Sequence, residues 1–462
     1  MSGGALEEDY RSRSLWLGQL DEPLTPRPPL PGDREFDVAI VGGGFTGLWT
    51  AYYVRTLQAD LRVAVIEREI AGFGPSGRNG GWVLGGLSGS PRAYRIARDR
   101  GRLAAALRAT HGAVDEIGRV AAAEGIDCGY VKAGALTIAT SSPQWARLRA
   151  RDIDADEELD GRLLSPAETE AMARVPGLHG GHHTPHGARI DPARLVRGLA
   201  AACERHGVTI YERTAATAIE RGRVRCGAHS VRAEVVIRAT ESYTTQMRGS
   251  RLRYLPLYSL MVATEPLPAA TWDELGWRDG LLIEDRHYLF FYAQRTTDGR
   301  IAIGGRGAPY RLSSPIDPRN ERDERVRGRL IATLARTFPQ AAGAQITHHW
   351  GGPLAAPRDW SMGIRFDPAR GLGEAGGYTG HGVGAANLSG RTLADLVLRR
   401  DSELVRMPWV GHRSRRWEPE PLRFLASAAI IRTLGAADRH EDASDRASAR
   451  VRLLRPFLPP PR

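Results

Sequence analysis

The stretch Phe36-Asp-Val-Ala-Ile-Val-Gly42-Gly43-Gly44-Phe45-Thr46-Gly47 decides the fold of this chain. Its first half is rich in β-branched residues and ends in glycine, which is typical of a short buried strand. From Thr46 the apolar positions follow helical spacing, and a second apolar run, 62–67, ends in the acid Glu67. Strand, glycine turn, helix, strand and acid in this order predict a dinucleotide-binding unit.

Each part of this unit has a physical role. Gly42 permits the tight turn, Gly44 lets the backbone approach a pyrophosphate, and Gly47 lets the helix pack closely on the strand. The helix N-terminus offers free N–H groups and a partial positive charge to that pyrophosphate. Glu67 lies 20 residues after Gly47, where an acid can bind a ribose hydroxyl. The nucleotide-binding candidates are Gly42, Gly43, Gly44, Phe45, Thr46, Gly47, Glu67 and Arg68.

A second glycine-rich stretch, Gly72-Phe-Gly-Pro-Ser76-Gly-Arg-Asn-Gly-Gly81, distinguishes FAD from NAD, which the first motif alone does not. With this stretch the sequence resembles the D-amino-acid oxidase/glycine oxidase superfamily of FAD-dependent amine oxidoreductases, and above all its γ-glutamylputrescine-oxidase-like branch. In that family the run passes along the pyrophosphate and reaches the flavin ring. The resemblance implies FAD contacts from Ser76, Gly77, Arg78, Asn79, Gly80 and Gly81.

Two later segments carry the same resemblance. The run 239–244, Ala-Thr-Glu-Ser-Tyr-Thr, is similar to a family segment Ala-Thr-Asn-Ala-Tyr-Thr, from which Glu241 and Ser242 depart. The Gly-x-x-Gly-His-Gly loop 377–382 is similar to a family segment whose N–H groups face the flavin edge that gains charge on reduction. The contacts implied are Ala216 with adenine, Ala239 and Thr240 with ribose and pyrophosphate, and Gly352, Gly380, His381, Gly382 and Val383 with flavin.

These motifs predict an α/β fold with two domains. A Rossmann-type, glutathione-reductase-like FAD-binding domain is expected from the discontinuous segments 35–129, 181–250 and 346–400. A second, α+β substrate domain, built on a mostly antiparallel sheet, is expected from 130–180 and 251–345. Residues 1–34 form an N-terminal arm, either anchored by Trp16 and Leu20 or disordered, and residues 401–462 form a C-terminal extension that packs through Trp409, Trp417 and Leu422.

Individual elements follow from local patterns. Helices are expected over 91–125 and from Pro192 to a stop at Gly207, because Asp191 is a good N-cap. Strands are expected at 130–139, 208–212, 233–237, 256–263, 288–292 and 300–305, with a hairpin turn at 295–299.

The resemblance implies that the second sheet covers the flavin and holds the substrate. Tyr258, His287, Tyr292 and Arg306 are then pocket candidates, although aromatic residues in strands are also common in cores. Arg306 could bind a substrate carboxylate, and His381 could lie near the ring. The catalytic candidates are therefore His381, Arg306 and Tyr258.

Composition narrows the alternatives. The 462 residues carry a net charge of +11, but Lys132 is the sole lysine among 64 basic residues and acids are interspersed, so no nucleic-acid partner is expected. The cysteines Cys128, Cys203 and Cys226 are too scattered for a disulfide framework or a metal site, and they fit a cytoplasmic location. No secretory signal or membrane span is apparent. Non-covalent FAD is expected, because 72–90 lacks histidine and no cysteine follows Cys226.

The expected reaction is oxidation of the C–N bond of an amine or amino acid. A hydride passes to flavin N5, the imine hydrolyses, and oxygen or another acceptor reoxidises the flavin, oxygen giving hydrogen peroxide. No protein acid/base pair is required if the amine binds unprotonated. Two other readings stay open: an FAD-dependent monooxygenase that uses NAD(P)H, and a non-catalytic flavoprotein subunit. The oligomeric state is left open.

Overall fold

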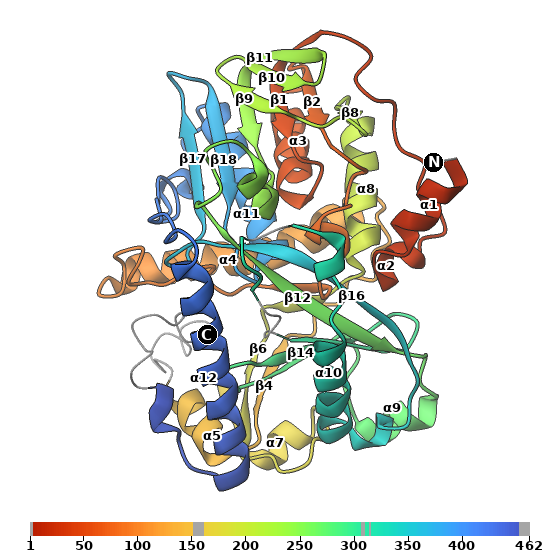
Figure 1. Cartoon of the computed structure of the whole chain (residues 1–462), viewed down its shortest axis with the longest axis vertical. Helices are drawn as coiled ribbons and strands as arrows, with labels where there is room; N and C mark the ends of the chain where they lie inside the picture. The colour runs from red at the N-terminus through yellow and green to blue at the C-terminus, as the bar shows by residue number, and fades with distance from the viewer. Residues whose placement is uncertain (1–2, 151–160, 306–309, 314–315, 452–462) are drawn as a thin grey trace.

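Two eight-stranded sheets organise the chain, one in the upper and one in the lower half of Figure 1. The computed structural model describes residues 3–150, 161–305, 310–313 and 316–451. The predicted α/β fold, with a parallel dinucleotide-binding sheet and a mostly antiparallel second sheet, is confirmed.

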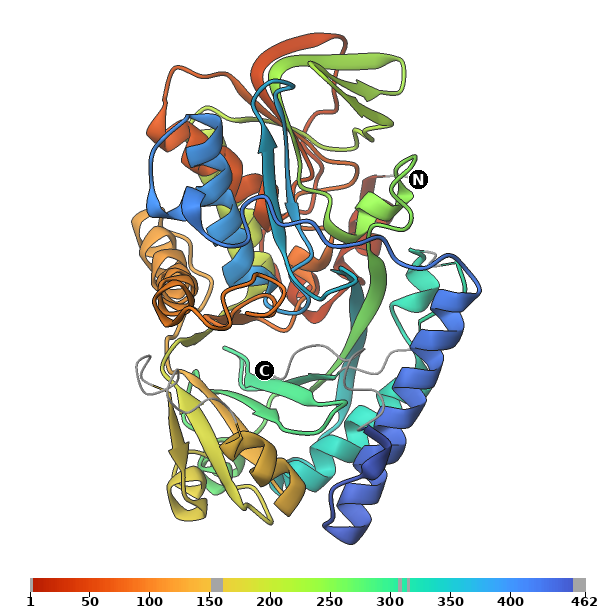
Figure 2. The same ribbon diagram turned by 90° about the vertical axis from the view of Figure 1, so that its left-hand side faces the viewer.

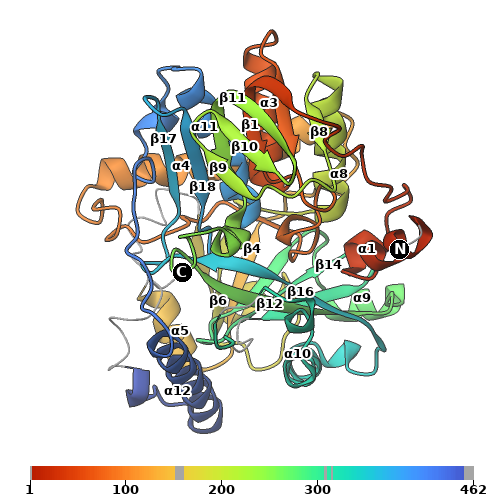
Figure 3. The same ribbon diagram turned by 45° about the horizontal axis from the view of Figure 1, so that its top comes forward.

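The first sheet is built around β1, the strand of the opening stretch. Its order is β17-β18-β11-β1-β2-β8, and β1 pairs in parallel with both β2 and β11. Figure 3 shows β17 and β18 at one edge and β8 at the other. The bounds are β1 Arg34–Val41, β2 Val63–Ile66, β8 Thr209–Tyr211, β9 Ala218–Glu220, β10 Arg223–Cys226, β11 His229–Arg238, β17 Gly363–Asp367 and β18 Leu372–Gly376.

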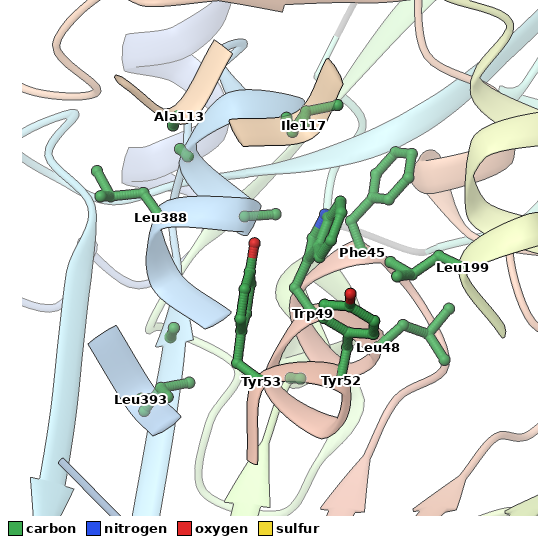
Figure 4. Packing of buried hydrophobic residues seen from close by; sticks show 14 of the residues in the cluster. Phe45, Leu48, Trp49, Tyr52, Tyr53, Ala113, Ile117, Leu199, Leu388 and Leu393 are labelled. Atoms are coloured by element: carbon green, nitrogen blue, oxygen red, sulfur yellow. The ribbon is translucent and has the colours of Figure 1, made fainter. Parts of the chain in front are cut away.

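Helices α3 (Phe45–Leu57), α8 (Pro192–Arg205) and α11 (Gly382–Val397) pack beside this sheet, with α4 (Arg100–Ala123) against α11. Figure 4 shows Tyr53 of α3 facing Leu388 and Leu393 of α11. The rings of Trp49 and Tyr53 stack with their centroids 5.6 Å apart. Gly390 of α11 lets that helix lie close to α3, because an added Cβ at Gly390 would lie 2.5 Å from the Cβ of Trp49.

The second sheet has the order β16-β12-β15-β14-β13-β4-β6-β5, and every pairing is antiparallel except β13 with β4. Its long strands β12 and β16 reach toward the first sheet (Figure 1). The bounds are β4 Ala135–Ala139, β5 Arg162–Leu164, β6 Gly180–Thr184, β12 Leu255–Thr264, β13 Leu282–Asp285, β14 Phe291–Arg295, β15 Ile301–Gly305 and β16 Ile346–Ala356. The predicted division gave 181–184 and 346–356 to the FAD domain, whereas these residues pair in this sheet.

Smaller elements complete the chain. A two-stranded sheet joins β3 and β7, and further helices and 3₁₀ turns lie around the two large sheets. Their bounds are β3 Trp82–Leu84, β7 Gly187–Arg189, α1 Gly3–Arg11, α2 Leu15–Gly18, α5 Ser142–Arg149, α7 Pro166–Glu170, α9 Ala269–Leu275, α10 Glu324–Thr337, η1 Pro75–Gly77, η2 Glu241–Gln246, η3 Pro318–Asn320, η4 Pro339–Ala341 and η5 Glu403–Arg406.

Three element predictions were wrong at their boundaries. The helix expected over 91–125 begins only at Arg100, where the Asp99 side chain accepts the N–H of Arg102. The strand expected at 130–139 begins at Ala135, because Gly134 has φ +85°. The strand expected at 288–292 is a loop up to residue 290, and β13 was missed.

The two ends of the described chain are packed on the body. Trp16 and Leu20 are buried, so the N-terminal arm is ordered from residue 3 and the disordered alternative was wrong there. Trp409 is fully buried, but Leu422 is 60% exposed and does not pack as expected. It begins helix α12 (Leu422–Ser444), which runs along the outer side of the lower half (Figure 2).

Candidate flavin site and substrate cavity

A cavity of about 870 Å³ lies where the two sheets meet, and both contribute to its walls. The first sheet supplies the carboxyl ends of β1, β2 and β11 and the N-terminus of α3. The second supplies β12, β14 and β16, and α11 and α12 add further wall. This volume is in the range of cofactor and small-molecule sites, and the carboxyl ends of parallel strands are where open α/β sheets bind ligands.

The glycine turn after β1 is fixed by two neighbouring side chains. The Ser76 hydroxyl accepts the N–H of Phe45 (2.9 Å), and the Glu67 carboxylate accepts the N–H of Gly43 (2.7 Å). Burial raises the pKa of Glu67. These bonds place an acid and a helix N-terminus side by side at the cavity, as binding of ribose and pyrophosphate requires.

Two kinds of glycine line or support this cavity. At Gly42, with φ +113°, an added Cβ would lie 2.5 Å from the carbonyl oxygen of Ala239, and at Gly47 it would lie 2.0 Å from a backbone oxygen. The fold therefore requires glycine at both. At Gly352 and Gly382 the nearest atoms to an added Cβ are 3.6 and 3.8 Å away. The fold tolerates a side chain there, so these glycines serve to leave space in the cavity.

In the second glycine-rich stretch, Arg78 and Asn79 hold the loop together. Arg78 is buried, pairs with Glu321 (2.7 Å) and donates to the Tyr243 hydroxyl (3.1 Å). The Asn79 side chain donates to the Ser76 carbonyl (2.9 Å) and accepts from a backbone N–H two residues on (2.8 Å). Both residues line the cavity, while their polar groups are engaged by protein atoms.

Glu241, one of the two departures from the family segment, lies in the cavity wall at a strained position. Its φ is +43°, a left-handed conformation that few side chains adopt readily. Its carboxylate accepts the N–H groups of Ala355 (2.7 Å), Gly377 (3.0 Å) and Tyr378 (3.4 Å). Burial nevertheless raises the pKa of Glu241 to about 7. The carboxylate thus joins η2, β16 and the loop before α11.

The C-terminal glycine loop meets α3 through a tyrosine. The Tyr378 hydroxyl lies 2.8 Å from that of Thr46, and Tyr378 is buried. His381 stands just before α11, and an added Cβ at Gly86 would lie 3.1 Å from its Nε2 atom. His381 is not among the cavity-lining residues, whereas Gly380 and Gly382 on either side of it are.

Aromatic side chains of the second sheet line the opposite wall. The Tyr292 hydroxyl bonds to Ser259 (2.6 Å), and the Tyr258 hydroxyl accepts the backbone N–H of Asp317 (3.1 Å). Burial raises the pKa of Tyr258. Glu284, at 8% exposure, brings a buried carboxylate to the same wall.

The structure brings most of the predicted site residues to one cavity. Gly42, Gly44, Phe45, Thr46, Glu67, Arg68, Ser76, Arg78, Asn79, Gly80, Ala216, Ala239, Thr240, Tyr258, Gly352, Gly380, Gly382 and Val383 line it. Gly43, Gly47, Gly77, Gly81 and His381 do not line it, and Arg306 lies outside the described residues. His287, a pocket candidate, instead sits between Asp285 and Asp442.

Several cavity residues were missed from the sequence. Phe73, Tyr243 and Tyr378 lay inside the quoted motifs and could have been included, because a bulky aromatic residue within such a motif is a usable signal. Trp82 and the residues of α12 carried no such signal.

The model of the family described as FAD dependent oxidoreductase matches residues 37–396. The chain belongs to this family. Gamma-glutamylputrescine oxidoreductase of Escherichia coli (strain K12) is 30% identical over 82% of this chain and 89% of its own length. Glycine oxidase from Geobacillus kaustophilus has a similar fold, with a TM-score of 0.66 at 21% identity over 80% of this chain and 96% of that chain.

L-α-glycerophosphate oxidase from Mycoplasma pneumoniae, solved with FAD bound, also has a similar fold, with a TM-score of 0.61 at 17% identity over 79% of this chain and 95% of that chain. The resemblance stated from the motifs is therefore confirmed, and this family member is an FAD-dependent oxidoreductase. Among its described residues, the helices are too short or too polar to cross a membrane.

Proposed function

We propose that this FAD-dependent oxidoreductase oxidises the C–N bond of an amine or amino acid. The observation that carries the proposal is the single cavity that joins the dinucleotide-binding turn to the aromatic wall of the second sheet. The relative that is 30% identical over 89% of its length is named as an oxidoreductase of gamma-glutamylputrescine, a compound that contains an amine. The family match over residues 37–396 extends over both sheets, which supports the same bond as the site of reaction here.

The residues present fit FAD. The helix N-terminus at Phe45, with Glu67 beside it, would hold the pyrophosphate and ribose, and the wall at Ala216 would receive the adenine. The space left at Gly352 and Gly382 would receive the ring. No cysteine or histidine of the described chain lines the cavity, which supports non-covalent binding. Once bound, FAD supplies the hydride acceptor, and oxygen or a second acceptor would remove its electrons.

The substrate would enter from the side of the second sheet. Tyr258 and Tyr292 would position it, and the Glu284 carboxylate offers a partner for a cationic nitrogen elsewhere in the substrate. Arg306 remains our candidate for binding a substrate carboxylate. His381, the remaining catalytic candidate, lies beside Gly86 and is not among the cavity-lining residues, so we assign it no contact with the substrate.

The test is an absorbance spectrum of the purified chain followed by anaerobic titration with amines and amino acids. Flavin bands that bleach with an amine support the proposal. Bands that bleach only with NADPH would replace it with the monooxygenase reading, and bands that no amine or nicotinamide bleaches would favour a non-catalytic subunit.

A matched pair of variants tests the position of the flavin separately. Gly382 and Gly328 both lie in helices, and neither has an atom closer than 3.8 Å to an added Cβ, but Gly382 alone of the two lines the cavity. We expect Gly382→Val to weaken FAD binding at least tenfold and Gly328→Val to leave it unchanged. Equal FAD affinity in the two variants would contradict this placement of the ring.

A further inference from the structure

One wall of the cavity comes from the C-terminal helix α12, which lies beyond the family match. That match ends at residue 396, whereas α12 spans Leu422–Ser444. Leu422, Ala426, Ile430 and Leu434 line the cavity and recur at every fourth position, so they follow one side of the helix. We call these four residues the α12 wall. All are apolar, and the stripe is about 18 Å long at 1.5 Å per residue.

The α12 wall leads from the surface into the molecule. Leu422 is 60% exposed, whereas Leu434 is 7% exposed. The inner end packs in a cluster with Ile430, Tyr288 and Leu289. Tyr288 and Leu289 also line the cavity, so the apolar surface continues from α12 onto the loop between β13 and β14.

Polar contacts hold α12 and this loop together as one unit. The Asp438 carboxylate accepts the backbone N–H groups of Tyr288 and Leu289, each at 2.9 Å. Arg147 pairs with Glu441 of α12 (2.8 Å) and donates to the Tyr288 hydroxyl (3.1 Å). The apolar surface is therefore held in place by polar groups of the turns of α12 that follow Leu434.

The charged residues at the outer end of the α12 wall are paired with one another. Arg358 pairs with Glu418 at 3.1 Å, and buried Arg423 pairs with Glu420 at 3.2 Å. Arg358, Glu418, Arg423 and Ser427 also line the cavity, but the charges there offset one another, so a ligand lying along the α12 wall itself meets hydrocarbon.

We propose that the α12 wall is an apolar subsite that selects substrates carrying an extended hydrocarbon group. The proposal rests on the proposed function for the reacting amine end, and it adds the chemical class of the rest of the substrate. Hydrocarbon transferred from water onto such a surface gains affinity with each buried methylene, whatever the head group.

The test uses the FAD-loaded full chain and two probe series of equal chain length. n-Alkylamines and n-alkanoates from two to eight carbons are titrated anaerobically, and the shift of the flavin absorption bands gives each Kd. We expect affinity to rise roughly fourfold per methylene, over at least three methylenes, in both series.

Two alanines of α12 give a matched pair of variants. Both are exposed, but Ala426 lines the cavity and Ala429 does not. Ala426→Glu should weaken binding of the eight-carbon probes at least tenfold and leave the two-carbon probes unchanged, whereas Ala429→Glu should follow the wild type.

Affinity independent of chain length in both series, or identical behaviour of the two variants, would overturn the subsite. If affinity rises with chain length in both series but no amine bleaches the flavin, the subsite is supported and the proposed amine oxidation is refuted.

Discussion

The buried carboxyl of Glu241 should make the stability of this protein fall as pH rises. Folding raises its pKa from 4.5 to about 7, because burial penalises the charged form more than its backbone donors stabilise it. The folded chain therefore binds this proton more tightly than the unfolded chain does. Stability from this group is present in full below pH 4.5 and is lost as pH rises through 7.

The magnitude follows from the size of the shift. Each pKa unit corresponds to about 1.4 kcal/mol, so the free energy of unfolding should fall by roughly 2.5 kcal/mol between pH 5 and pH 8.5 from this group alone. For a chain of 462 residues this corresponds to about 2.5 °C in Tm. Glu241→Gln mimics the protonated carboxyl, so it should match the wild type near pH 5 and exceed its Tm by about that amount at pH 8.5.

The assay is a set of thermal unfolding curves at saturating FAD across this pH range. Glu168→Gln is the control, because Glu168 is exposed and its backbone bond to Ser165 and pairing with Arg162 lower its pKa to about 2. It stays charged throughout, so its Tm difference from wild type should not change with pH. If the Tm difference between Glu241→Gln and the wild type is also independent of pH, the carboxyl of Glu241 does not have the raised pKa that the prediction requires.

Three further predictions concern the cavity. Gly47→Ala should lower Tm and weaken FAD binding, because its Cβ would lie 2.0 Å from a backbone oxygen, a clash that costs about 1–3 kcal/mol. Gly112→Ala, with no atom within 4 Å of the added Cβ, should instead raise Tm slightly. Equal changes of the two variants in thermal scans and FAD titrations would contradict this prediction. Glu321→Gln should lower the free energy of unfolding by about 3 kcal/mol, because it leaves the buried charge of Arg78 without this carboxylate. A change below about 1 kcal/mol in urea titrations would show that the ion pair contributes little to stability. Tyr258→Phe should lower kcat/KM for an amine about tenfold, because one hydroxyl contact is lost, and it should leave the Kd for FAD unchanged. If steady-state kinetics give the same kcat/KM as the wild type, Tyr258 does not contact the substrate.

The dinucleotide-binding unit could be predicted because its signals are local. The turn, the helix start and the strand of 36–47 are fixed by residues within a few positions of one another. The helix after Asp191 is a second case: its carboxylate accepts the N–H groups of Ala193 and Arg194, and Gly207 ends the segment with φ +82°. Such signals depend on backbone geometry that sequence spacing reveals directly.

The failures arise where a residue is controlled by a distant segment. Tyr288 and Leu289 read as part of a strand, but Asp438, about 150 residues later, binds their N–H groups and holds them in a loop. Arg78 lines the cavity as predicted, but its guanidinium is also paired with Glu321, a partner far along the chain that the sequence did not indicate. Spacing along the sequence contains no information about these partners, so neither arrangement could be predicted.

Cofactor binding in this family member depends on local motifs, whereas part of its substrate selection depends on a segment far along the chain. The turn at Gly42, the acid Glu67 and the loop at Gly380 all lie within the family match, so relatives that share these motifs share the cofactor. The α12 wall lies after that match and meets a loop that it also shapes. A substitution in α12 should therefore change which amine is preferred and leave FAD affinity unaltered. Substrate preference can diverge in this way while the flavin site stays constant, because α12 supplies part of the substrate wall and lies outside the segments proposed to hold the flavin.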